Sequence, residues 1–335
     1  MVKYEDVSVY ESLERDYRQK FSEMSVTQEG IRYLKIRTLV DIEPLKGSRK
    51  LRDFLQIRKN EVRKTIINDI RKKLFLSENL SNEQIDKLLR DVYLELSTFR
   101  NINFDKVKSS VFNIAQEGDK YWDAWNSVYR DDVRQHIQHH FVRTLGIQSY
   151  EELLEKIGKE LDPIIKGYVV ISWYNQWCST IIEDFILTHP RVIPTARRID
   201  KVDFFFLNIP FDLKISFIPR EFIRQYLRKR VISKDEDIIE EIRNDPESLI
   251  TWFYENQGEN RFSDSHRLFI VLADSVKLEN SWKLKANFSI IQKEINSFLN
   301  NCNKNDIKKV EWEFRGTKIE GKFKTYSYLL LIEKG

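Results

Sequence analysis

The chain has 335 residues, of which 41% are hydrophobic and 13% aromatic, and its 56 Lys or Arg against 52 Asp or Glu give a formal net charge of +4. This composition excludes a disordered tail and allows a large core, in two domains or in one domain with a helical extension. Because the charge nearly cancels, attraction to a polyanion depends on local clusters of Lys and Arg rather than on net charge.

The cysteine and hydropathy patterns indicate an intracellular protein. Cys178 and Cys302 lie far apart, in segments expected to be helical and without CxxC spacing, which argues against a zinc site or a disulfide framework. The N-terminus has no apolar signal core, and no run of about 18 uncharged apolar residues occurs. We therefore expect a soluble cytoplasmic protein that does not enter a membrane.

The first part of the chain, residues 1–165, predicts a mostly helical domain. A short strand is expected around residues 33–40. Apolar residues recur at a period near 3.6 across residues 51–75, which predicts an amphipathic helix. Capping boxes at Ser81 and Ser149 mark two helix starts, and the aromatic-rich segment 104–145 predicts two more helices.

Residues 166–335 predict an α/β domain with a mixed sheet. A buried helix over 169–187 ends at His189 and Pro190, because the residue before proline disfavours helical geometry. After a strand pair, residues 220–253 are helical with a break near 244–246, and residues 267–273 form a continuous apolar strand. The remaining elements are expected at residues 287–299 (helix), 310–314 (strand) and 323–332 (strand).

The strand pair carries the candidate chemistry. Asp203 begins one apolar strand, and Asp212-Leu213-Lys214 lies on the next. Side chains two residues apart share a face of a strand, so Asp212, Lys214 and Ser216 line one side and apolar residues line the other. A turn around residues 208–210 brings the strands within about 5 Å of each other, so Asp203 and Asp212 are expected to converge.

Two convergent carboxylates form a hard-oxygen site that suits Mg²⁺, for which Mn²⁺ can substitute. Lys214 beside them can orient or deprotonate an attacking water and offset the negative charge that develops on a phosphate. The competing interpretation is an exposed strand edge, on which the acids form ordinary salt bridges with Lys201 and Lys214.

The spacing of Asp203 and the Asp212-Leu213-Lys214 triplet resembles the PD-(D/E)XK superfamily of restriction-endonuclease-like nucleases, over roughly residues 167–335. The resemblance implies an αβββαβ core, one or two divalent metals held by Asp203 and Asp212, and hydrolysis of phosphodiester bonds in DNA. It also implies a glutamate on the preceding helix, for which Glu183 is the candidate by position. Val202 stands where the family usually has proline, and the triplet begins with Asp rather than the more frequent Glu.

The function implied by this resemblance is a Mg²⁺-dependent DNA endonuclease of the type II-like restriction or antiphage defence class. The helical domain would then serve DNA engagement or assembly, as a homodimer or with a partner subunit of a defence system. The alternative is a non-catalytic nucleic-acid-binding or scaffold subunit of a defence or repair complex that retains the nuclease fold.

Basic residues supply the candidate DNA contacts. Between Arg49 and Lys73 there are ten Lys or Arg against three acids, and between Arg220 and Arg230 five against one. Either cluster fits phosphate contacts or a solvated helix face equally well. The individual candidates for nucleic-acid contact are Arg197, Arg198, Ser216, Arg224 and Arg228.

Three further patterns favour a structural interpretation. Asp200 is an alternative metal ligand, but it has the opposite strand parity to Asp203. The histidines at 136, 139 and 140 have helical metal spacing without a matching second cluster, so a polar helix face is preferred. The aromatic groups at residues 121–125 and 173–177 have the spacing of helix packing rather than base stacking.

Overall fold

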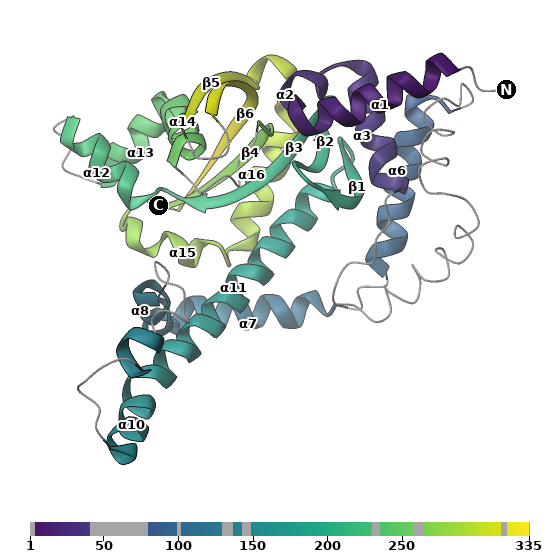
Figure 1. The fold of residues 1–335 in the computed structure, drawn as a ribbon. Helices are drawn as coiled ribbons and strands as arrows, with labels where there is room; N and C mark the ends of the chain where they lie inside the picture. The colour runs from purple at the N-terminus through teal and green to yellow at the C-terminus, as the bar shows by residue number, and fades with distance from the viewer. Residues whose placement is uncertain are drawn as a thin grey trace.

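A six-stranded mixed sheet forms the centre of the molecule, with helices on both faces (Figure 1). The computed structural model describes residues 4–40, 80–98, 102–128, 137–142, 149–229, 235–256, 264–315 and 320–334. The strands, in the spatial order β1-β2-β3-β4-β6-β5, are β1 (Val192–Ile199), β2 (Val202–Phe206), β3 (Ile209–Phe217), β4 (Arg267–Asp274), β6 (Glu320–Lys334) and β5 (Lys308–Arg315). Antiparallel pairs at each end are joined by the parallel pairs β3–β4 and β4–β6. The expected mixed α/β architecture is therefore confirmed.

Helices account for the described chain before β1. They are α1 (Tyr4–Gln19), α2 (Phe21–Met24), α3 (Gln28–Val40), α6 (Asn82–Thr98), α7 (Phe104–Glu117), α8 (Asp119–Val128), a π-helical turn Gln138–Val142, α10 (Tyr150–Lys156), a second π-helical turn Ile157–Leu161, and α11 (Asp162–Leu187). Both predicted capping boxes are present: the Ser81 and Ser149 hydroxyls each accept a backbone N–H three residues on, and the Gln84 and Glu152 side chains accept the serine N–H in return. In Figure 1, α10 and the start of α11 project away from the sheet.

Helix α3 replaces the strand predicted at residues 33–40, so that prediction was wrong. Tyr33 and Leu34 pack into a cluster with α1 and β2, whereas Ile36 packs into a second cluster with α6 and β1. Burial on two sides spreads the apolar residues around the helix, between Lys35, Arg37 and Thr38, and such a short pattern does not distinguish a buried helix from a strand.

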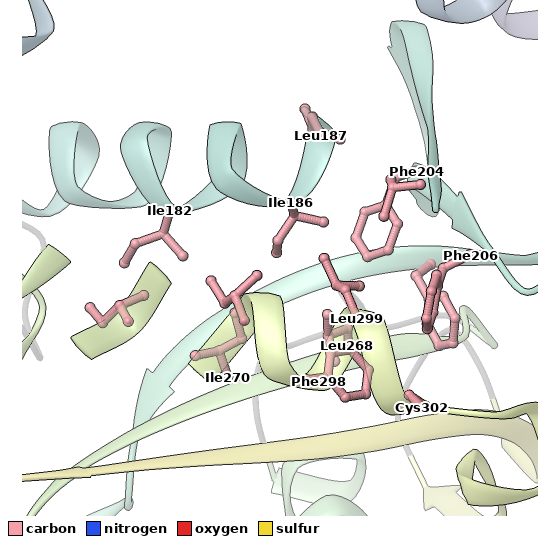
Figure 2. Packing of buried hydrophobic residues seen from close by; sticks show 14 of the residues in the cluster. Ile182, Ile186, Leu187, Phe204, Phe206, Leu268, Ile270, Phe298, Leu299 and Cys302 are labelled. Carbon is pink, nitrogen blue, oxygen red and sulfur yellow. The ribbon is translucent and has the colours of Figure 1, made fainter. Parts of the chain in front are cut away.

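One face of the sheet is covered by α11 and by α16 (Phe288–Asn301). Figure 2 shows Ile182 and Ile186 of α11 approaching the sheet side chains Phe204 and Ile270. From α16, Ile291, Ile295, Phe298 and Leu299 enter the same cluster. Arg191 caps the end of α16 by donating to the carbonyl oxygens of Leu299, Asn300 and Cys302 at 2.6, 2.6 and 3.0 Å.

The other face is covered by two separate groups of helices. Over β4, β5 and β6 lie α12 (Arg220–Lys229), α13 (Asp235–Asn244) and α14 (Pro246–Asn256), which pack on Phe269, Val271 and Trp312. Over β1 and β2 lie α1 to α3, which pack on Val202 and Phe205. Strand β3 runs between these two groups.

The helices and strands predicted after residue 166 are present among the described residues, and two further elements, a strand and a short helix, were not predicted. The helix break at Asp245, the strand at residues 267–273, the helix after Asn287 and the two last strands all occur. The short helix α15 (Ser281–Leu284) and 3-10 turns at Leu278–Asn280 and Lys304–Asp306 fill the connections. Strand β1 was not predicted. Its sequence contains Pro194 and the charged pair Arg197 and Arg198, which are more typical of a loop than of a strand.

Hydrophobic clusters combine residues from before and after position 165. Phe21 packs with Phe205, Val111 with Trp282, and Leu89 with Ala196. The division into domains 1–165 and 166–335 stays a prediction.

The predicted amphipathic helix at 51–75, with its basic cluster, lies outside the described residues. Within the described ranges, no helix is both long enough and apolar enough to span a bilayer.

Candidate active site

The β2–β3 hairpin brings Asp203 next to the Asp212–Lys214 segment. Its turn is formed by Leu207 and Asn208, whose φ angles of 53° and 58° suit a tight hairpin loop. Phe204 pairs with Phe211, and continuing that antiparallel register by one step sets Asp203 opposite Asp212. The Asp203 carboxylate oxygen Oδ2 accepts the Leu213 backbone N–H at 2.8 Å. The side chain of Asp203 is thus held against the backbone of β3.

Asp212 is held from the adjacent strand β4. The parallel register places Asp212 beside Arg267, and the Arg267 guanidinium Nη2 lies 2.8 Å from Asp212 Oδ2. The Arg267 side chain is 3% exposed, whereas that of Asp212 is 28% exposed. The Asp212 backbone N–H donates to the His266 carbonyl at 2.9 Å. One side of the carboxylate therefore meets a buried cation, and the side chain remains accessible to solvent.

Arg267 is in turn supported by a buried tyrosine of α14. Its guanidinium carbon lies 5.6 Å from the centre of the Tyr254 ring. The Tyr254 hydroxyl is 2.9 Å from the Ser265 carbonyl and 2.9 Å from Ser327 Oγ. Burial raises the pKa of Tyr254 to about 12, although the charge of Arg267 opposes the increase. Tyr254 is therefore neutral and hydrogen-bonded, and its ring packs against the Arg267 guanidinium.

Lys214 and Ser216 follow Asp212 on the same side of β3. Leu213 and Ile215, the alternate residues, pack into the cluster beneath α11 and α16. Lys214 pairs in register with Phe269, whose ring stacks on Phe253 of α14. Both polar side chains are half-buried. The predicted alternation of a polar and an apolar side of the strand is therefore present.

A second lysine lies within electrostatic range of Lys214. Lys285 is buried, and its Nζ lies 3.2 Å from Asn175 Oδ1 of α11. Burial lowers the pKa of Lys285 to about 8; the nearby Cys178 opposes this effect and the charge of Lys214 adds to it. The surroundings of Lys214 therefore contain a further cation.

Glu183 lies on α11, where it is half-buried. Its neighbours Ile182 and Ile186 enter the core cluster, and the adjacent Asp184 accepts the Tyr93 hydroxyl at 3.1 Å. The described residues contain no group of three His, Cys, Asp or Glu side chains placed to hold a metal ion. The Leu213–Asp203 hydrogen bond thus joins Asp203 to the strand that carries Asp212, and a metal-ligand role for Glu183 stays a prediction.

The structure describes the positions of some of the remaining candidates. Asp200 is exposed in the β1–β2 turn, where its carbonyl accepts the Tyr17 hydroxyl at 2.7 Å. Arg197 and Arg198 belong to β1, and Arg224 is exposed on α12. Ser216 Oγ donates to the Phe217 carbonyl at 3.3 Å. The side chains of Arg197, Arg198 and Arg228 lie outside the described set, as does His136.

Trp122 and Tyr174 act in packing, as predicted for these aromatic groups, whereas the side chain of Trp125 lies outside the described residues. The Trp122 and Trp282 rings stack with centres 4.8 Å apart, and the Tyr174 hydroxyl donates to the Trp282 carbonyl at 2.7 Å. Trp173 is 40% exposed, at a tilted contact with Trp177.

Sequence reasoning missed Arg267 as a site residue. The available signal was a lone arginine at the head of the apolar run at 267–273, a position where an isolated charge is costly unless it is paired. Its partner followed only from the parallel register of β3 and β4. No protein-family model, curated protein or solved structure matches the chain.

The pair Asp203 and Asp212 fits a hard divalent cation. Mg²⁺ is usually held by one or two carboxylates, with waters and substrate phosphate oxygens completing its coordination. Two carboxylates on neighbouring strands, one of them 28% exposed, meet that requirement without a third protein acid.

Proposed function

We propose that the chain is a Mg²⁺-dependent DNA endonuclease of the type II-like restriction or antiphage defence class. The observation that carries the proposal is the hydrogen bond from Leu213 N–H to the Asp203 carboxylate, which joins the first acid to the Asp212-x-Lys214 strand. The element order supports it: α11, then β1 to β3, then α12 to α14, then β4 parallel to β3. The order is compatible with the αβββαβ core that the sequence resemblance implies, with three helices where that core has one.

Each residue then has a distinct task. Asp203 and Asp212 would hold the cation, which when bound stabilises charge on the phosphate and lowers the pKa of a coordinated water. Lys214, two residues from Asp212 on the same side of β3, would supply an ammonium donor to the phosphate and offset the negative charge that develops there. The Leu213 backbone fixes Asp203, and Arg267 fixes Asp212, so neither carboxylate must be reoriented during the reaction.

A second candidate function follows from the Arg267 contact. A carboxylate already paired with a buried guanidinium has less negative charge to offer a cation. This favours a non-catalytic subunit that binds nucleic acid through surface cations. Such a subunit would bind DNA more weakly as salt increases and would cleave none with Mg²⁺ or Mn²⁺.

Cleavage assays on plasmid DNA with Mg²⁺ and with EDTA distinguish the two functions. We expect Asp212→Asn and Lys214→Met each to reduce cleavage at least about 100-fold, since each removes a group that acts at the reacting phosphate. The circular dichroism spectrum should be unchanged. Full cleavage by both variants would exclude the proposed site.

The matched controls are Glu311→Gln and Lys324→Met. These residues form an exposed ion pair between β5 and β6, with side chains 67% and 59% exposed. Cleavage by both controls should equal that of the unmodified chain, because neither side chain lies near Asp203 or Asp212 in the sheet order.

A further inference from the structure

Arg267 is a buried cation in contact with a proposed metal ligand. Its side chain is 3% exposed, its guanidinium lies 2.8 Å from the Asp212 carboxylate, and the Tyr254 ring lies beside it. Ordinary surface ion pairs are screened by water, whereas this cation acts from the protein interior through a medium of low polarity.

The formal charges of the two acids and of Lys214 and Arg267 sum to zero. Asp203 and Asp212 contribute two negative charges, and Lys214 and Arg267 contribute two positive charges. A divalent cation that approaches the carboxylates therefore meets little net attraction, and the charge on Arg267 repels it directly. The same guanidinium fixes the orientation of Asp212, because a buried planar donor restricts its carboxylate partner to a few hydrogen-bonding orientations.

We propose that Arg267 is a positioning residue that sets the affinity of Asp212 for a divalent cation. It holds the carboxylate in one orientation and lowers that affinity. This inference rests on the proposed function. Under it, the negative charge needed to retain the ion comes from the phosphate of the nucleic acid, since Mg²⁺ sites of this kind are completed by substrate oxygens.

The test is calorimetric titration of Mn²⁺ into the full-length chain without nucleic acid. Arg267→Gln removes the charge and retains an N–H donor, so we expect Mn²⁺ to bind on the order of tenfold more tightly. With Mg²⁺ and DNA, the same variant should turn over more slowly because Asp212 is less firmly oriented. Unchanged or weaker Mn²⁺ binding by folded Arg267→Gln would overturn the inference.

A matched control and a conservative variant complete the design. Arg243→Gln makes the same substitution at the exposed ion pair with Glu333, and it should leave Mn²⁺ affinity unchanged. Arg267→Lys keeps the positive charge and should stay within about threefold of the unmodified affinity. This variant remains informative if Arg267→Gln does not fold, because tenfold tighter binding by Arg267→Lys would also contradict the inference.

The outcomes separate the inference from the nuclease proposal. If the unmodified chain cleaves no DNA while Arg267→Gln binds Mn²⁺ more tightly, the inference stands and the nuclease proposal fails. If cleavage depends on Asp212 while Arg267→Gln binds Mn²⁺ no more tightly, the nuclease proposal stands and the inference fails.

Discussion

At the scale of single residues, His266 shows how buried polar groups position the site. The residue is fully buried immediately before β4, and its carbonyl accepts the Asp212 N–H. Its ring Nδ1 accepts the Tyr326 backbone N–H at 3.0 Å, and Nε2 lies 2.9 Å from Ser25 Oγ. Because Nδ1 is an acceptor, the ring must be neutral. Its contacts connect the start of β4 to Ser25 at the end of α2 and to β6.

Stability should therefore fall in mild acid. Burial lowers the pKa of His266 to about 4, although Asp264 opposes the shift, whereas an unfolded histidine titrates near 6.5. Between these values the unfolded chain binds more protons than the folded chain, so the contribution of His266 is complete above about pH 6.5 and is lost as the pH falls towards 4. The expected loss is up to roughly 3 kcal/mol.

Urea unfolding at pH 7.5, 5.5 and 4.5 measures this effect. His266→Gln can keep one hydrogen bond and has no proton to gain, so its free energy of unfolding should change less over this range. Equal pH dependence in the variant and the unmodified chain would show that His266 is not the titrating group.

At the scale of elements, the α2–α3 turn depends on a glycine. A Cβ built on Gly30 would lie 1.9 Å from the Met24 carbonyl oxygen and 2.9 Å from Thr27 Oγ1. Thr27 Oγ1 also accepts the Gly30 N–H at 3.0 Å. The close approach of α3 to the end of α2 thus requires a residue without a side chain.

The pair Gly30→Ala and Gly158→Ala tests this packing. We expect Gly30→Ala to lower the free energy of unfolding by about 1–3 kcal/mol, because the Met24 backbone must move. Gly158 lies in a π-helical turn with nothing within 4 Å of its added Cβ, so its alanine variant should be neutral or more stable by about 0.5–1 kcal/mol. Urea denaturation of both variants measures the contrast, and equal losses would contradict it.

At the scale of the whole molecule, the N-terminal helices and the sheet share their cores. Phe21 of α2 is fully buried, its ring lies 5.9 Å from the ring of His266, and its cluster includes Val202 and Phe205 of β2. The strand that carries Asp203 is therefore packed on one side by helices from the start of the chain.

Unfolding should consequently be coupled across this interface. Phe21→Ala should cost about 3–5 kcal/mol, as for other large-to-small changes in a core, and should shift the melting of the helices and the sheet together. Phe112→Ala, at a side chain 53% exposed, should change stability by less than about 0.5 kcal/mol. Differential scanning calorimetry gives the test, and separate transitions of which only one moves would show that the two parts unfold independently.

Sequence alone determined the elements whose signals are local. Apolar periodicity and turn residues located α11, α12 to α14, β4 and α16, and the alternation at Asp212, Leu213 and Lys214 set the two sides of β3. The β2–β3 hairpin was also predictable, because both strands are apolar and only a few residues separate them. Local patterns failed at two elements. Burial on two sides obscured the helical period of α3, and the charges of Arg197 and Arg198 obscured the strand alternation of β1.

Only the tertiary structure decided what surrounds Asp212. Arg267 reaches it because β3 and β4 pair in parallel after the excursion through α12 to α14, and no periodicity within either strand specifies that register. The position of α1 to α3 against β2 likewise depends on contacts between distant segments. Local patterns therefore determined which residues carry the candidate chemistry, and long-range strand pairing decided the charge that acts on them.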